Sequence, residues 1–144
     1  MSNASRIFVA LDASDGASLV LAAATKFVDL SGGKLVLFRA VGIPPDLPQS
    51  ILEMTNSRVE ESLLKHARKD LELLAKQAEG RVEKIHAVLG TTWDAICREA
   101  KEVGADLIVI GSHGHSRLAR MLGTTAAKVV NNAELNVLVV RTQL

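Results

Sequence analysis

Three glycines and two threonines near the end of the chain could form a phosphate-binding site. Gly111 and Gly114 follow an apolar run, and Gly123 stands directly before Thr124 and Thr125. Glycine lets backbone N–H groups approach an anion, and the first N–H groups of a helix are unpaired and lie at its positive end. A helix that begins after Gly123 would therefore favour a phosphate, to which the threonine hydroxyls could also donate. The same residues are ordinary turn and helix-cap chemistry, so both interpretations stay open.

An acidic residue after the first apolar run is the second candidate. The carboxylate of Asp12 could accept hydrogen bonds from a ribose or from the edge of an adenine. Alternatively, Asp12 or Ser14 caps the helix that follows. If strand order reverses between the first strand and the later ones, the ends of strands 6–12 and 106–111 lie side by side, and the acid and the glycines face one cleft.

Histidines and arginines within the glycine segment are further candidates. His113 and His115 could contact a phosphate, but two histidines at this spacing without nearby cysteines or acids make a poor metal site. We therefore predict that no metal is bound there and that both side chains are exposed to solvent. Arg117 and Arg120 could each clamp a terminal phosphate with two hydrogen bonds, or could lie on a solvated face.

The elements that position these residues alternate between apolar runs and helical patterns. This alternation predicts a three-layer α/β/α sandwich of the Rossmann-like kind, with a five-stranded, mostly parallel sheet and right-handed crossovers. The whole chain, 1–144, is expected to form one domain. The expected strands are 6–12, 34–41, 81–90, 106–111 and 136–141, and the expected helices are 19–30, 51–80, 91–104 and about 124–131.

Composition narrows the possible functions. The net charge of +1 gives no electrostatic attraction to nucleic acids or membranes, and aromatic residues at 3% are too scarce for stacking on bases of a single strand. A single cysteine, Cys97, excludes an internal disulfide, and no apolar run approaches the length of a membrane span. These features predict a cytoplasmic protein that binds neither nucleic acid nor membrane.

Several motifs together resemble the universal stress protein family of the UspA type over nearly the whole chain. They are "VALDASD" at the first strand, "HAVLG" before a helix, "ADLIVIGSHG", the glycine frame ending in Gly-Thr, and the terminal "LNVLVVR". The resemblance implies a fold like that of the adenine nucleotide alpha hydrolases and the binding of ATP or AMP, with or without Mg²⁺. It also implies a homodimer formed through the last strand, 136–141.

The resemblance also implies roles for particular residues. Asp12 matches the acid near the adenosine moiety, and Val41 matches the residue whose backbone meets the adenine. The nucleotide-binding residues predicted in this way, together with those inferred from the loops, are Ala10, Leu11, Asp12, Ser14, Val41, Ile110, Gly111, His113, Gly114, Arg117, Gly123, Thr124 and Thr125.

Two departures from the family pattern affect this site. The eight residues 115–122 between the second and third glycines are one fewer than in the commonest ATP-binding frame. Ala13 follows the acid where glycine is usual, and Ala17 replaces a usual serine. Because similar short spacing resembles another branch that retains nucleotide binding, the site is predicted to be altered and not lost.

Three classes of function fit these features. The first is a dimeric regulatory protein that binds an adenine nucleotide and responds to stress. The second is a slow ATPase or self-phosphorylating protein, although no Walker motif and no general base can be assigned, so no catalytic residue is predicted. The third is a dimerisation module without nucleotide. An apolar last strand at a sheet edge would favour self-pairing, so a charge at Val139 is expected to weaken the dimer.

Overall fold

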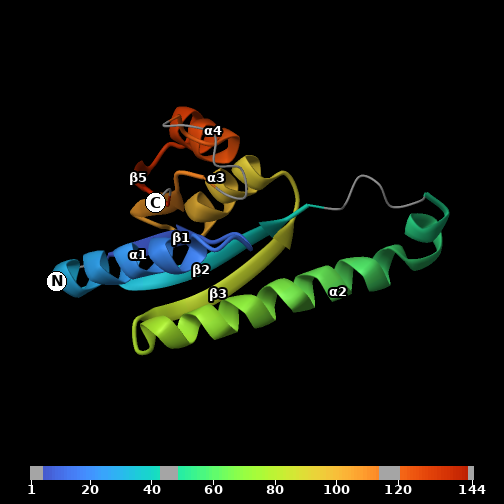
Figure 1. Ribbon diagram of the computed structural model, residues 1–144, viewed down its shortest axis with the longest axis horizontal. Helices are drawn as coiled ribbons and strands as arrows, with labels where there is room; N and C mark the ends of the chain where they lie inside the picture. The colour runs from blue at the N-terminus through green and yellow to red at the C-terminus, as the bar shows by residue number, and fades with distance from the viewer. Residues whose placement is uncertain (1–4, 43–48, 114–120, 143–144) are drawn as a thin grey trace.

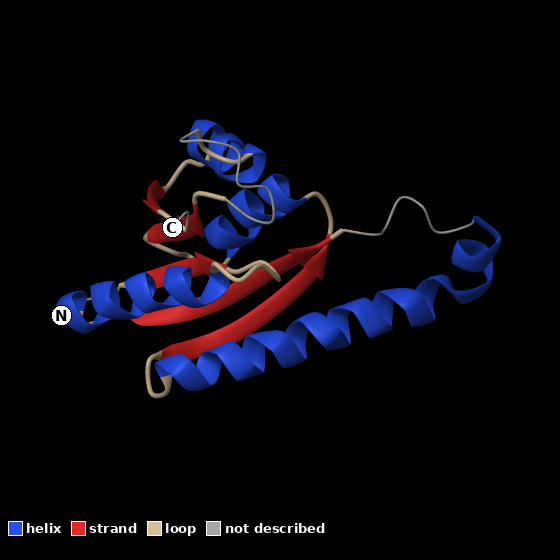
Figure 2. Ribbon diagram, viewed as in Figure 1, coloured by secondary structure: helices blue, strands red, loops and turns tan. Residues whose placement is uncertain are grey.

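The computed structural model describes residues 5–42, 49–113 and 121–142, with only the backbone described for 49–57. Its helices and strands alternate along the chain (Figures 1 and 2). The strands are β1 (Arg6–Ala10), β2 (Lys34–Val41), β3 (Val82–Leu89), β4 (Leu107–Gly111) and β5 (Asn136–Val140). The helices are α1 (Ala17–Ser31), α2 (Gln49–Ala75), α3 (Thr92–Glu102) and α4 (Thr124–Asn132), and a short 3-10 turn, Lys76–Ala78, follows α2.

The five strands form one sheet in the order β3-β2-β1-β4-β5. Every neighbouring pair is parallel, including β1 with β4 and β4 with β5. The expected three-layer α/β fold is therefore confirmed. Strand order reverses at β1, so the carboxyl ends of β1 and β4 lie side by side as predicted, and β5 is an edge strand.

Two apolar clusters hold the three layers together. One lies between the sheet and α1 with α2, and includes Leu21, Leu37 and Leu71. The other lies between the sheet and α3 with α4, and includes Phe38 and Ile96. These residues are at most 2% exposed, and each contributes roughly 1.5–3 kcal/mol by its burial. The aliphatic runs of the central strands are thus buried on both faces, as parallel sheets require.

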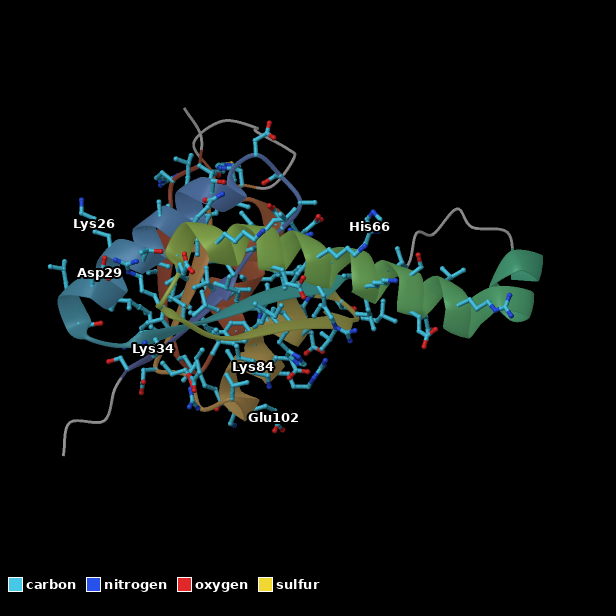
Figure 3. All side chains as sticks on the ribbon, turned by 90° about the horizontal axis from the view of Figure 1, so that it is seen from below. Lys26, Asp29, Lys34, His66, Lys84 and Glu102 are labelled. Atoms are coloured by element: carbon cyan, nitrogen blue, oxygen red, sulfur yellow. The ribbon has the colours of Figure 1, made fainter. Side chains whose placement is uncertain are left out.

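Some boundaries differ from the sequence-based expectations. The first strand ends at Ala10, so Leu11 and Asp12 belong to the loop that crosses the top of the sheet. Helix α1 begins only at Ala17, and its cap residue is Gly16, without a side-chain cap. Neither Asp12 nor Ser14 caps this helix, so the capping alternative for Asp12 is wrong. Helix α2 extends beyond the ends of the strands, and His66 lies exposed on it (Figure 3).

Candidate functional site

A cavity of about 370 Å³ opens at the carboxyl ends of β1 and β4. Its walls come from both strands, from β2, and from the first residues of α1, α3 and α4. Ligands of open parallel sheets bind where strand order reverses, and the cavity lies at that place. A second described cavity, beside Arg6 and Glu83 at the opposite end of the strands, is smaller.

The glycine segment forms one end of the main cavity. Gly111 is the last residue of β4, and the N–H of Gly123 donates to the carbonyl of Ser112 at 2.7 Å, which closes the loop between them. A Cβ atom on Gly123 would lie 3.0 Å from that same carbonyl oxygen. Glycine is therefore favoured here by the close approach and not by its backbone angle, since its φ of −62° is one that any residue adopts.

Three helices begin at the cavity wall without a side-chain cap. Gly16 precedes α1, Gly123 precedes α4, and Thr92 is the first residue of α3; all three line the cavity. No side chain among the described residues accepts a hydrogen bond from these helix starts as a cap. Because a helix N-terminus carries partial positive charge and unpaired N–H groups, the cavity favours an anion.

A buried polar network supports the glycine end. The hydroxyl of Thr142, just beyond β5, accepts from the N–H of His113 at 3.3 Å and donates to its carbonyl at 3.0 Å. The N–H of Thr142 donates to Ser112 Oγ at 3.1 Å, and Ser112 Oγ lies 3.0 Å from His113 Nδ1. The segment after β4 is thus attached to the segment after β5 through side chains that are almost wholly buried.

The prediction that His113 is exposed to solvent is wrong. It is only 5% exposed, because Thr142 and Ser112 hold it against the ends of β4 and β5. Its Nε2 atom has no hydrogen-bond partner among the described residues. A buried nitrogen without a partner is costly, so this atom is a candidate contact for a ligand or a water.

The loop after β1 forms another part of the cavity wall, which we call the acid end. Asp12 is exposed there, and its Oδ1 accepts from the N–H of Ser14 at 2.9 Å and from the Ser14 hydroxyl at 2.5 Å. Arg39, on β2, donates to the carbonyls of Leu11 and Asp12 at 3.0 and 2.7 Å. The cavity wall therefore combines a carboxylate with three helix N-termini.

Between the two ends the wall is largely apolar. Ala10, Phe38, Ala40, Ile96 and Ile110 line this part of the cavity. An apolar wall with a few convergent polar groups is typical of small-molecule sites. A flat aromatic base could lie against it, with a carboxylate at one side and anion-binding groups beyond.

Most of the residues predicted from the sequence line this cavity. They are Ala10, Leu11, Asp12, Ser14, Ile110, Gly111, His113, Gly123, Thr124 and Thr125. Val41 does not line it, and its carbonyl accepts from the N–H of Gly90 at 3.1 Å. Gly114 and Arg117 lie outside the described residues, as do His115 and Arg120.

The helix cap of α4 is Gly123, so neither Thr124 nor Thr125 caps it.

Sequence reasoning did not assign Arg39, Thr92 or Thr142 to the site, and it considered Ser112 only as a phosphate acceptor in a self-phosphorylating protein. All four residues line the cavity. Arg39 follows four consecutive apolar residues of its strand, and a charge at such a position was a signal that could have identified it. Thr142 gave no local signal, because its role depends on the parallel pairing of β5 with β4.

Other chemistry is not apparent in the described parts of the chain. No cluster of three or more potential metal ligands occurs among the described residues. Burial, with a smaller contribution from Asp94, raises the pKa of the Cys97 thiol, which disfavours a reactive thiolate. Within the described segments, no helix combines the length and apolarity that a membrane crossing needs.

Comparison with known proteins shows which family the sequence of this chain matches. A model of the universal stress protein family matches residues 3–141. The chain is 35% identical over 83 residues to universal stress protein A homolog 2 of Coxiella burnetii, which covers 58% of this chain and 57% of that relative. The alignment thus spans little more than half of the relative's length.

Solved structures extend the likeness to the whole chain. A universal stress protein in complex with cAMP is 29% identical, with a TM-score of 0.65, and the alignment covers 99% of this chain and 100% of that one. A universal stress protein from Archaeoglobus fulgidus in complex with dAMP is 25% identical, with a TM-score of 0.61 and coverage of 97% and 99%.

Proposed function

This chain belongs to the universal stress protein family, and from that premise we propose that its main cavity binds an adenine nucleotide, ATP or AMP. The proposal rests on one observation, that three features line the same cavity. These are the carboxylate of Asp12, an apolar wall, and three helix N-termini without side-chain caps. A nucleoside phosphate presents donor groups, a flat base and an anion in a matching arrangement.

The phosphate would lie at the glycine end. The N–H groups that begin α4, after Gly123, would donate to phosphate oxygens, and the hydroxyls of Thr124 and Thr125 are placed to add donors. A Cβ at Gly123 would lie 3.0 Å from the carbonyl oxygen of Ser112, so the start of α4 or the segment after β4 would have to shift. When ATP is bound, Mg²⁺ would be held mainly by the phosphates, because no described cluster of acids could hold it alone.

Related proteins support an adenine ligand. The two similar structures were solved with cAMP and with dAMP, which share an adenine base and a phosphate. The present chain has a comparable fold over nearly its whole length, so the same class of ligand is the natural candidate for its cavity.

We further propose that the protein acts by binding and not by turnover, as a homodimeric regulatory module in the cytoplasm. The edge position of β5 supports self-association, because an unpaired parallel-sheet edge offers free N–H and C=O groups to a second copy. Leu138, on this strand, is 36% exposed.

Calorimetric titration of the purified protein tests the proposal. AMP and ATP, the latter with and without Mg²⁺, should bind with a dissociation constant on the order of micromolar, and GMP more weakly. Mass spectrometry of the small molecules released on denaturation would show whether a nucleotide is already bound. If nothing is released and no adenine nucleotide gives heat, the protein is a dimerisation module without nucleotide.

A further inference from the structure

Arg39 is a nearly buried cation in the wall of the cavity, and no part of the proposed function requires it. Its side chain is 11% exposed, although it stands on a strand whose preceding residues are apolar. An arginine in such a place must use its donors within the protein, because burying an unpaired charge is very costly. The partners that it uses therefore indicate what it does.

Two of these partners are backbone carbonyls in the loop after β1. Arg39 Nε donates to the carbonyl of Leu11 at 3.0 Å, and Nη2 donates to the carbonyl of Asp12 at 2.7 Å. The N–H of Leu11 in turn donates to the carbonyl of Phe38 at 2.8 Å. The two residues that follow β1 are thus held by β2 through three hydrogen bonds.

The third partner connects this loop to helix α2, which covers the same face of the sheet as α1. Arg39 Nη1 donates to Asp70 Oδ2, on α2, at 2.9 Å. Asp70 is half exposed, so this ion pair contributes little energy by itself. Its geometric effect is larger, because it fixes the plane of the guanidinium that contacts both carbonyls.

The loop held in this way carries the only acid that lines the described cavity wall. Oδ1 of Asp12 already accepts from the backbone and hydroxyl of Ser14. No described residue donates to Oδ2. Because the main chain of Asp12 is fixed by Arg39 and one carboxylate oxygen is fixed by Ser14, the second oxygen has a defined position as an acceptor.

We propose that Arg39 is a positioning residue that sets the specificity of the cavity for the nucleoside part of its ligand. It holds Asp12 so that Oδ2 accepts a hydrogen bond from one donor group of the nucleoside. This inference rests on the proposed function. Three groups of adenosine supply the required donor chemistry, the 2′-hydroxyl and the 3′-hydroxyl of the ribose and the 6-amino group of the base.

The test compares AMP with three analogues that each lack one donor. dAMP lacks the 2′-hydroxyl, 3′-dAMP lacks the 3′-hydroxyl, and purine riboside 5′-monophosphate lacks the 6-amino group. Wild-type protein should prefer AMP over one of them by about tenfold or more, the value of a hydrogen bond to a charged acceptor. The analogue that is discriminated against identifies the donor that Asp12 receives.

Arg39→Met removes the donors and keeps the length of the side chain. It should lose most of this preference while still binding the poorer analogue with nearly wild-type affinity, and Asp12→Asn should lose the same preference. Arg39→Lys keeps the charge and one donor group, so it should restore part of the preference. It also serves as the second variant if Arg39→Met does not fold.

Arg81→Met is the matched control. Arg81 also pairs with an aspartate, Asp29, at 2.6 Å, but on an exposed surface that does not line the cavity. This variant should keep the full preference for AMP.

The outcomes separate the two proposals. An undiminished preference in Arg39→Met, or in Arg39→Lys where only that variant folds, overturns the role of Arg39. Binding of AMP and all three analogues with equal affinity by the wild type overturns it as well. If the wild type binds none of them, the proposed function itself fails, and the inference fails with it.

Discussion

The two ends of the cavity are built in different ways. At the glycine end, Ser112, His113 and Thr142 are at most 5% exposed and bond to one another and to the backbone. At the acid end, Asp12 is exposed and is positioned by two neighbours, Ser14 and Arg39. The glycine end is thus part of the core, whereas the acid end is a loop held from one side.

This difference indicates that the two ends recognise different parts of the nucleotide. A phosphate is the same in every nucleotide, so a rigid set of N–H donors suits it. The nucleoside differs between ligands, and a single placed carboxylate can distinguish its donor groups. Substitutions at the glycine end should therefore weaken all nucleotides alike, and those at the acid end should mainly change the preference among them.

The largest expected effect comes from Gly123→Val. A Cβ atom there meets the carbonyl oxygen of Ser112 at 3.0 Å, and overpacking of this kind costs ~1–3 kcal/mol. Affinity for AMP, ATP and dAMP should fall together by about 10- to 100-fold in calorimetric titration. Gly42→Val is the control, because a Cβ at Gly42 meets nothing within 4 Å. Equal affinities in the two variants would show that the glycine loop is not the phosphate site.

Thr142→Val should have the next largest effect. It removes the hydroxyl that bonds both the N–H and the carbonyl of His113, and a buried unpaired polar group costs ~1–3 kcal/mol of unfolding free energy. Urea denaturation should show this loss, and nucleotide affinity should fall several-fold. In Thr25→Val, which loses one bond to the carbonyl of Leu21, only the stability should change. A Thr142→Val protein with unchanged affinity would show that the network does not support the site.

Ser14→Ala tests the acid end with a smaller expected change. Oδ1 of Asp12 loses the hydroxyl donor but keeps the N–H of residue 14. The lost bond is worth ~1 kcal/mol, so the preference of AMP over its analogues should decrease about fivefold. Ser18→Ala, whose hydroxyl is 3.4 Å from Gln77 Nε2, should leave the preference intact. A uniform loss of affinity for all nucleotides would contradict the division between the two ends.

The smallest expected effect on nucleotide affinity comes from the edge strand. Leu138→Lys places a charge on β5, which should reduce the mass seen in sedimentation from dimer to monomer. It replaces the Val139 variant suggested by the sequence, because Val139 packs against the core beneath α3 and α4. Affinity for AMP should change less than twofold. An unchanged mass would count against pairing through β5.

Much of the fold could be predicted because apolar runs and helical spacing are local properties. The start of the first strand at Arg6, the helix starting at Thr124 and the neighbouring positions of β1 and β4 all followed from pattern and topology. Glycine spacing and an acid after a strand likewise identified both ends of the cavity, because each feature is visible within a few residues.

The features of the site that could not be predicted depend on contacts between distant parts of the chain. His113 was predicted to be exposed because its neighbours in sequence are polar, but Thr142, 29 residues away, buries it. Arg39 acts on the loop at Leu11, 28 residues earlier, and is fixed by Asp70, 31 residues later. Such pairs cannot be recognised until the register of the strands is known.

The most direct test of the account is NMR mapping of backbone amides during titration with AMP. Saturating AMP should shift the amides at both ends of the main cavity, at Leu11–Ser14, Gly111–His113 and Gly123–Thr125, and should leave those beside Arg6 and Glu83 unchanged. Saturation that shifts only one end, or only the amides near Arg6, would contradict the proposal that this cavity binds the whole nucleotide.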